Sequence, residues 1–143
     1  MKIVKQISVF VENKKGHLYG ITDILGDNGI DIKILSIADT TDFGILRMIV
    51  DQTEKAVKLL KDDGRTVKVT DVAAVMIDDS PGGISKVIKT LSDYEIEIEY
   101  LYAFRLREEG KSCAIFKVPE AEKAVTALEK ANIKLMGIEE ICE

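Results

Sequence analysis

The sequence is poor in the residues that mark metal sites and disulfide-stabilised folds. Its 143 residues include one histidine, His17, two cysteines, two prolines and no tryptophan. A metal site needs several ligands, and none clusters with His17 along the chain. Cys113 and Cys142 do not form a close metal-binding pair, so we expect reduced thiols, with a disulfide between them as the alternative. The sequence therefore predicts no metal and no other cofactor.

Basic clusters and long apolar segments are lacking as well. The formal net charge is −5, and no stripe of basic and aromatic residues suits a nucleic acid. No apolar run approaches the length that spans a membrane, and Met1-Lys2 leads straight into a strand pattern rather than a signal peptide. We therefore expect a cytoplasmic protein that binds neither nucleic acid nor a membrane.

Apolar residues nevertheless make up 46% of the chain and charged residues 31%, which is typical of a globular protein. Their spacing switches between the period of a strand and that of a helix. Glycine or paired polar residues mark the ends of these segments, and Asp39–Gly44 has the composition of a hairpin loop. The first half of the chain is thus predicted to form, in order, a strand at 3–12, a helix at 18–28, a strand from 30, a strand at 45–50, a helix at 53–61 and a strand from 67.

The same pattern then repeats. Between Gly16 and Leu35, eight residues have similar counterparts 66 positions later. After the hairpin the offset becomes 68, because Glu54–Val57 matches Glu122–Val125. The two extra residues belong in the second hairpin, Leu106–Lys111, where a longer turn costs little. A register that persists through a helix, a strand and a second helix indicates an internal duplication.

Two copies of β-α-β-β-α-β predict an α+β protein in which the ferredoxin-like unit occurs twice. We expect residues 1–70 and 71–143 to form one domain each, with an antiparallel sheet that carries both helices on one face. The junction Thr70-Asp71-Val72 has no flexible linker, so the copies are expected to share one continuous sheet of eight strands, with four helices.

The other face of such a sheet carries no helix. Leu35, Ile37, Leu101 and Ala103 are expected to point toward that face. An uncovered apolar patch usually marks an interface, so the sequence predicts a homodimer.

A loop, a helix and a strand follow one another within residues 78–104. Ser80-Pro81-Gly82-Gly83 follows an apolar strand pattern, and the residues after it have the spacing of a helix. Free amides at the start of a helix attract carboxylates, so the amides of Gly82 and Gly83 are predicted to bind one, with Gly16-His17 as a weaker site. The alternative is that Pro81-Gly82-Gly83 only makes a turn. If φ is negative at Gly83, a valine there is expected to keep the fold and to crowd the ligand.

The two segments Asn13–Ile34 and Asp79–Phe104 resemble the ACT domain, a small-molecule-binding regulatory module. Ser36–Thr40, Asp42–Arg47 and Glu99–Phe104 look like the corresponding parts of stand-alone proteins made of two ACT copies. The resemblance covers nearly the whole chain and leaves no part for a catalytic domain. It implies an amino-acid sensor without enzymatic activity.

In that family the ligand lies between neighbouring units, against the glycine loop of one unit and the start of the second strand of the same or the adjacent unit. The resemblance therefore implies two sets of ligand-binding residues: Asn13, Lys15, Gly16, His17, Leu18 and Asp31 in the first copy, and Asp79, Ser80, Pro81, Gly82, Gly83, Ile84, Glu97 and Ile98 in the second. The family often has asparagine where this chain has Asp31 and Glu97. A carboxylate cannot donate a hydrogen bond as an amide does, so this departure puts the type of ligand in doubt.

Two other classes of function remain open. Acylphosphatases share the topology but need an arginine cradle, which Lys14-Lys15-Gly16-His17 does not match, and no Ser-His-Asp or Cys-His arrangement is visible. The second class is an oligomerising regulatory subunit that binds no ligand and acts on an enzyme partner by contact. Binding of a free amino acid would distinguish the sensor from such a subunit.

Overall fold

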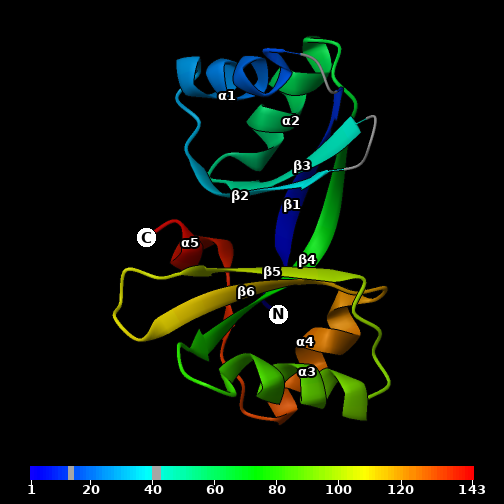
Figure 1. The fold of residues 1–143 in the computed structure, drawn as a ribbon, viewed down its shortest axis with the longest axis vertical. Coiled ribbons are helices and arrows are strands. Elements are labelled where there is room, and N and C mark those ends of the chain that lie inside the picture. Colours follow the sequence, from blue (N-terminus) through cyan, green and yellow to red (C-terminus); the bar gives the residue numbers. More distant parts are fainter. Residues whose placement is uncertain (13–14, 40–42) are drawn as a thin grey trace. The chain divides into compact units, whose positions relative to one another are not determined.

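The computed structural model describes residues 1–12, 15–39 and 43–143. The chain divides into two compact units (Figure 1). The first unit consists of Lys5–Thr70 together with Cys142, and the second of Met1–Val4, Asp71–Ile141 and Glu143.

The first unit has the predicted order of strands and helices. It comprises β1 (Val4–Glu12), α1 (His17–Asp27), β2 (Ile32–Asp39), β3 (Phe43–Val50), α2 (Thr53–Asp62) and the beginning of β4 (Val67–Asp78). The strands lie in the order β2-β3-β1-β4, and β3 pairs antiparallel with both β1 and β2. This order is the ferredoxin-like arrangement that the sequence predicts.

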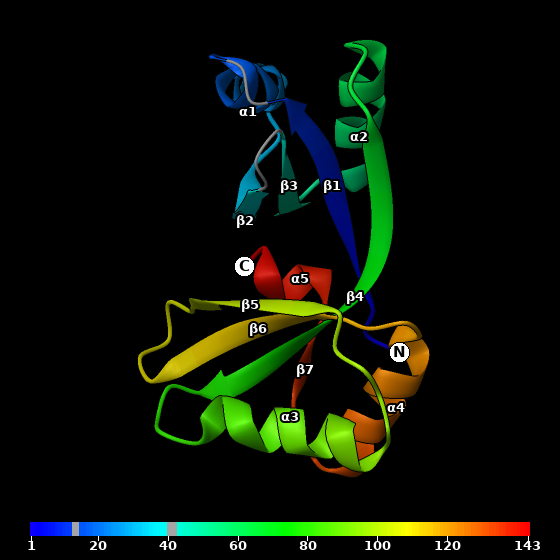
Figure 2. The ribbon, with the colours of Figure 1, turned by 45° about the vertical axis from the view of Figure 1, so that its right-hand side comes forward.

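The second unit repeats this arrangement. It continues β4 and adds α3 (Gly83–Asp93), β5 (Tyr100–Arg105), β6 (Lys111–Lys117), α4 (Ala121–Lys130), β7 (Leu135–Met136) and α5 (Ile138–Ile141). The strand order is β5-β6-β4-β7, with β6 and β7 antiparallel to β4. Figure 2 shows α3 and α4 lying against the sheet of this unit.

Equivalent residues form the two cores, which confirms the duplication. Both cores join the two helices to the inner strands of the sheet, and helix and strand residues correspond at offsets of 66 and 68. Ile21 and Leu25 of α1 correspond to Val87 and Leu91 of α3, Ala56 and Leu60 of α2 to Ala124 and Leu128 of α4, and Leu46 and Met48 of β3 to Ala114 and Phe116 of β6.

The described residues form seven strands and five helices, where the sequence predicts eight and four. The strands expected on either side of Thr70-Asp71-Val72 are one continuous strand, β4, which takes part in both units. The short helix α5 was not predicted. Strand β5 begins at Tyr100 rather than Ile96, because pairing with β6 starts at the Glu99 amide, which donates to the Lys117 carbonyl. Ile96 and Ile98 alternate because both pack on the core, not because they belong to a strand.

The strand register corrects the expected orientation of four apolar residues. Leu35 lies opposite Met48 and Leu101 lies opposite Phe116. Directly opposed residues of an antiparallel pair share a face, and both partners belong to the cores beneath the helices. Leu35 and Leu101, with Ile37 and Ala103 two residues further along, therefore lie on the helix side. They are exposed because β2 and β5 are the edge strands of their units.

All four long helices end in the same way. After α1 the Ile30 amide donates to the Leu25 carbonyl at 2.9 Å, and after α3 the Ile96 amide donates to Leu91 at 2.9 Å. This bond requires a left-handed residue just before it, a position that glycine usually occupies. Gly29 has φ +72°, whereas Glu95 adopts φ +58° with a side chain. Glu95 therefore carries strain that Gly29 does not.

We expect Glu95→Gly to stabilise the protein by about 1 kcal/mol, because glycine adopts the left-handed conformation without a steric penalty. The free energy of unfolding from urea titration measures the effect. Glu95→Ala removes the same carboxylate and keeps the strain, so it serves as the control. Equal stability of the two variants would contradict the explanation.

Candidate functional site

A hollow with a volume of about 410 Å³ lies at the start of α3, within the second unit. We call it the α3 hollow. It lies between the loop that follows β4, the first turn of α3 and the segment that precedes β7. Its lining residues are Met76, Ile77, Asp78, Ser80, Pro81, Gly82, Gly83, Lys86, Val87, Lys111, Asn132, Ile133 and Lys134. Ser80 to Gly83 were predicted to bind ligand, and the structure places all four in the wall of this hollow.

The backbone at the start of α3 offers hydrogen-bond donors to the hollow. Gly82 is the N-cap residue with φ +87°, and no side chain caps the helix. The Gly83 amide, predicted to bind a carboxylate, instead donates to the Ser80 carbonyl at 3.0 Å. No backbone hydrogen bond in the described residues takes up the amides of Ile84 and Ser85. A carboxylate at this helix end would therefore meet those two amides and the positive end of the helix dipole.

The loop requires glycine at position 83. A Cβ built on Gly83 would lie 2.2 Å from the Asp78 carbonyl oxygen, which is backbone and cannot turn aside. The expectation that Gly83→Val keeps the fold is therefore wrong. A Cβ on Gly82 would meet nothing within 4 Å, so only its positive φ favours glycine there.

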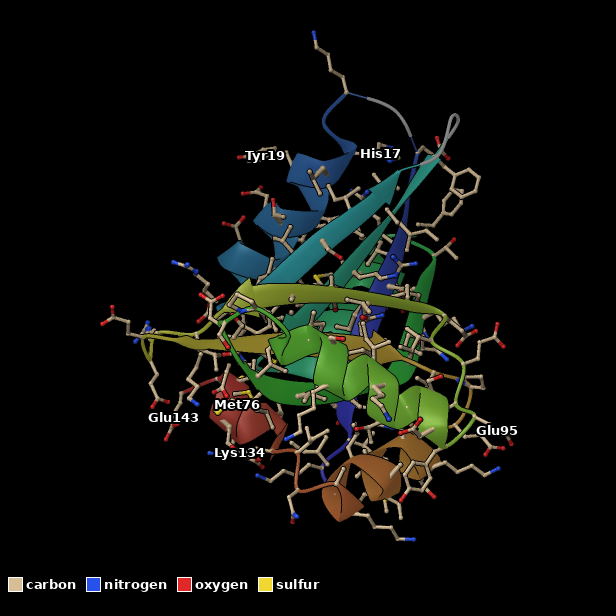
Figure 3. The ribbon with its side chains drawn as sticks, turned by 60° about the horizontal axis from the view of Figure 1, so that its bottom comes forward. His17, Tyr19, Met76, Glu95, Lys134 and Glu143 are labelled. Atoms are coloured by element: carbon tan, nitrogen blue, oxygen red, sulfur yellow. The ribbon has the colours of Figure 1, made fainter. Side chains whose placement is uncertain are left out.

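Lysines supply most of the charge of the hollow. Lys111 forms an ion pair with Asp78 at 2.5 Å, across the paired ends of β4 and β6. This hydrogen bond lowers the pKa of Asp78 and raises the pKa of Lys111. Lys86 and Lys134 form no hydrogen bond or ion pair through their ammonium groups in the described part of the chain. The Met76 amide donates to the Lys134 carbonyl at 2.9 Å, which holds Lys134 beside β4, as Figure 3 shows.

The first unit fills the equivalent place with its own side chains. The repeat aligns Lys86 with Gly20, and the missing side chain leaves room for Arg65. A Cβ on Gly20 would lie 2.8 Å from an Arg65 guanidinium nitrogen. Arg65 also donates to the His17 carbonyl at 3.4 Å and pairs with Asp63 at 3.0 Å.

The α1 loop otherwise matches its counterpart in backbone conformation. Gly16 caps α1 with φ +84°, close to the value at Gly82. His17, shown with Tyr19 in Figure 3, begins the helix at the position of Gly83, and its buried Nδ1 has no hydrogen-bond partner. Lys15 and Leu18 are exposed, and Asn13 lies outside the described residues.

The remaining predicted residues lie away from the loop of their own unit. Asp31 lies beyond the C-terminal end of α1, where its amide donates to the Asp51 carboxylate and its side chain pairs with Lys33. Glu97 and Ile98 follow the end of α3, and an 11-residue helix separates them from Gly82 by about 16 Å. Ile84 packs on the core. Within one unit, therefore, the loop and the start of the second strand do not meet.

A second hollow, of about 410 Å³, adjoins the β5–β6 hairpin. We call it the hairpin hollow. Its lining residues are Asp79, Arg105, Leu106, Arg107, Glu108, Glu109, Gly110 and Lys111. Asp79 belongs here rather than to the α3 hollow, and it pairs with Arg105 at 3.1 Å. Lys111 lines both hollows.

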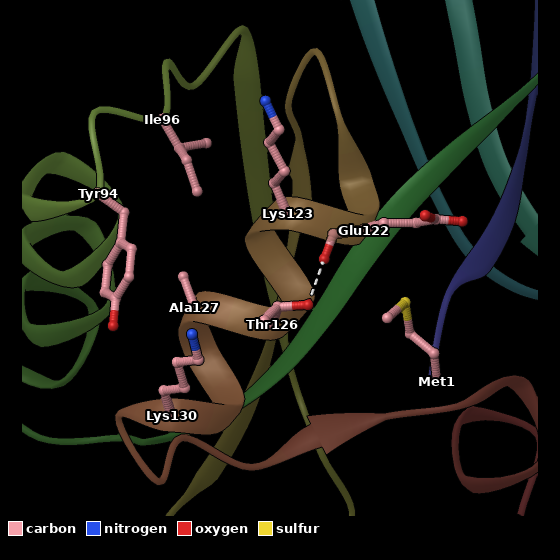
Figure 4. Close-up of a pocket in the computed structure, with 8 residues that line it drawn as sticks. All are labelled: Met1, Tyr94, Ile96, Glu122, Lys123, Thr126, Ala127 and Lys130. Atoms are coloured by element: carbon pink, nitrogen blue, oxygen red, sulfur yellow. Dashed lines mark hydrogen bonds between the residues drawn. The ribbon is translucent and has the colours of Figure 1, made fainter.

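A third hollow, of about 380 Å³, lies beside the outer face of α4 (Figure 4). Met1, Tyr94, Ile96 and Ala127 give it an apolar lining, edged by charged residues of α4. The Thr126 hydroxyl donates to the Glu122 carbonyl within the helix. None of its lining residues belongs to the glycine loops that precede α1 and α3. The hollow lies beyond the C-terminal end of α3, so we do not assign the ligand site to it.

Sequence reasoning missed Asp78, Lys86, Lys111, Asn132 and Lys134. Lys86 lies one turn into a predicted helix, three residues after Gly83. The predicted ferredoxin-like order places the last strand of each copy beside the first, which brings Asn132 and Lys134 to the end of β4. The position of Lys86 in the helix and the order of the strands could both be inferred from the sequence. Only the folded topology shows that they bring these residues to one hollow.

The family model of the ACT domain pair matches residues 1–143. This chain belongs to the ACT domain pair family. The resemblance that the loop and strand segments suggest is therefore confirmed over the whole chain.

Solved structures agree with this assignment. Protein BT0572 from Bacteroides thetaiotaomicron is 34% identical, with a TM-score of 0.91 over 97% of this chain and 95% of that chain. The ligand-free regulatory subunit of aspartate kinase from Thermus thermophilus is 17% identical, with a TM-score of 0.65 over 92% and 97%. Aspartate kinase from Synechocystis is 20% identical, with a TM-score of 0.59 over 96% of this chain and 28% of that one. The last two likenesses show the fold alone. No curated protein matches this ACT domain pair.

Two other kinds of feature are absent from the described residues. No three or more His, Cys, Asp or Glu side chains gather there in a way that could hold a metal ion. None of the described helices is long and apolar enough to cross a membrane. Cys113 is buried, as expected, and burial raises the pKa of its thiol to about 12.

We expect Gly83→Ala to destabilise the protein by about 2–3 kcal/mol, because its Cβ would overlap the Asp78 carbonyl and displace the loop. Gly82→Ala should cost only about 1 kcal/mol, the strain of a left-handed alanine in open space. Urea titration of both variants measures the difference. A smaller loss for Gly83→Ala than for Gly82→Ala would show that the close approach to Asp78 is absent in solution.

Proposed function

We propose that this ACT domain pair is an amino-acid-binding regulatory protein without catalytic activity, and that the α3 hollow holds the ligand. The observation that carries the proposal is a single hollow that combines the start of a helix, charged side chains of both signs and an apolar wall within one unit. Its volume of about 410 Å³ lies in the range typical of small-molecule sites. The unoccupied amides of Ile84 and Ser85 give it a place for a carboxylate.

The charges of the hollow suit the two ends of an amino acid. The carboxylate would lie at the first turn of α3, where Lys86 adds a positive charge. The ammonium group would lie at Asp78 or at the side-chain oxygen of Asn132, the acceptors in the wall. Met76, Ile77, Val87 and Ile133 would contact the aliphatic part of the ligand.

We propose one site per chain rather than two. The place equivalent to the α3 hollow holds the Arg65 side chain, which is only 17% exposed. Gly20, which stands where the second unit has Lys86, makes room for this arginine. A ligand in the first unit would have to displace Arg65 from both His17 and Asp63.

The regulatory role rests on the family and on its structural relatives. Two solved structures with this fold are described as regulatory subunits of aspartate kinase, from Thermus thermophilus and Thermus flavus. By analogy we propose that this chain works in the cytoplasm and acts on an enzyme partner. The alternative is a subunit that regulates by contact and binds no ligand, and binding of a free amino acid distinguishes the two.

We expect one or more of the twenty amino acids, at about 100 times Kd, to raise the melting temperature by about 5–10 °C. Lys86→Met should remove most of this shift, because it deletes a positive charge at the start of α3. Lys89→Met is the matched control on the same helix, since Lys89 pairs with Asp93 and does not line the hollow.

Calorimetry on the same ligand should give about one site per chain. Two sites would contradict the assignment of Arg65 as an occupant of the first unit. The absence of any shift with all twenty amino acids would favour the subunit that acts by contact.

The homodimer stays a prediction, on a different surface from the one expected. Leu35 and Ile37 are 48% and 49% exposed on β2, an edge strand of the first unit. An edge strand with exposed apolar side chains is suited to pairing with a second copy. We expect light scattering at micromolar concentration to give twice the mass of one chain, and Ile37→Lys to shift the protein to the monomer. Equal masses for the unchanged protein and the Ile37→Lys variant would contradict the assignment of the dimer interface to β2.

A further inference from the structure

The α3 hollow carries more positive charge than the α-carboxylate of an amino acid requires. Its lining includes three lysines, Lys86, Lys111 and Lys134, and one carboxylate, Asp78. Lys111 is committed to Asp78 by the 2.5 Å ion pair. Lys86 and Lys134 remain, and in the described part of the chain neither ammonium group forms an ion pair or a hydrogen bond. The charge of Lys86 acts on Asp78 and that of Lys134 acts on Glu140 only from a longer distance. Two ammonium groups are therefore free to form ion pairs with a ligand.

The three lysines reach the hollow from different elements. Lys86 lies in the first turn of α3, Lys111 begins β6 and Lys134 immediately precedes β7. The ion pair with Asp78 fixes Lys111, and the hydrogen bond from the Met76 amide fixes the backbone of Lys134. Their convergence depends on the fold, because 48 residues separate the first from the last in the sequence.

The first unit shows that the fold does not require these lysines. At the same repeat positions it has Gly20, Phe43 and Thr66. Phe43 stacks on Phe10 with ring centroids 4.6 Å apart, and Arg65 covers Gly20. The same architecture is thus built without any of the three charges. The cluster belongs to the hollow of the second unit, not to the general needs of the duplicated fold.

From this charge pattern we infer that the ligand of the α3 hollow carries two anionic groups, and that it belongs to the class of acidic amino acids. The α-carboxylate meets the start of α3 near Lys86, and the side-chain carboxylate meets Lys134. This inference rests on the proposed function for the position of the ligand, and goes beyond it in naming the chemical class. A neutral amino acid would leave Lys134 without an ion pair. A basic one would meet lysines of its own sign.

Calorimetry with two pairs of near-isosteric ligands tests the inference: glutamate against glutamine, and aspartate against asparagine. We expect one of the acids to bind about ten-fold or more tightly than its amide, because a charged hydrogen bond at Lys134 replaces a neutral one. Lys134→Met should reduce that preference to nearly one and leave the affinity for the amide unchanged. Lys89→Met, outside the hollow, should keep it. Urea titration confirms that both variants are folded.

The outcomes distinguish this inference from the proposed function. Binding of an amide as tightly as its acid overturns the acidic class while amino-acid binding stands. A preference for the acid that survives Lys134→Met overturns the role of that lysine. Glutarate, a dicarboxylate without an amino group, is titrated in parallel. If it binds and no amino acid does, the dianionic hollow is supported and the amino-acid function fails. If nothing binds, both fail.

Discussion

Each unit is held together by the burial of one face of a four-stranded sheet under two helices. In the first unit Ile7 and Val9 of β1 pack against Ile21 and Leu25 of α1, and the second unit repeats the arrangement with smaller strand residues. Apolar burial of this kind is the main favourable term in folding. It also fixes where each helix begins and ends above its sheet. The ligand loop, the left-handed helix ends and the hollow are all placed by this packing.

A backbone contact then shapes the loop within the space that the core leaves. Gly83 comes so close to the Asp78 carbonyl that no side chain fits. The α1 loop has the same N-cap conformation at Gly16, yet it carries His17 at the next position. The two loops therefore differ in how closely the helix returns to the preceding strand. The two units also differ in that the second has Lys86 where the first has Gly20. Together these differences leave an open hollow in the second unit, whereas Arg65 fills the equivalent place in the first.

Much of the fold could be predicted from the sequence because the duplication shows each element twice. The helix periods were recognised at Ile21 and Leu25 and again 66 residues later, and the glycine before each helix marked its start. Strand orientation was harder. Leu35 and Leu101 were assigned to the wrong face, because a single-residue change of register moves a side chain to the other side of the sheet. The junction at Thr70 gave no sign that two predicted strands are one.

The site was only partly accessible for a similar reason. Ser80 to Gly83 form a local motif, which a sequence shows directly. Lys111 and Asn132 reach the same hollow through strand pairing and through the segment after α4, and their roles depend on contacts between distant parts of the chain. The filling of the first unit by Arg65 depends on the absence of a side chain at Gly20. No local pattern indicates that kind of complementarity.

Lys111 lines the α3 hollow on one side and the hairpin hollow on the other. Its ammonium group is held by Asp78, and its backbone closes the turn through hydrogen bonds with Leu106 and Glu108. An anion bound near this ion pair would change the electrostatic potential at Arg105 and Arg107 in the neighbouring hollow. One ammonium group thus borders both hollows, so the proposed ligand in one of them would act electrostatically on the other.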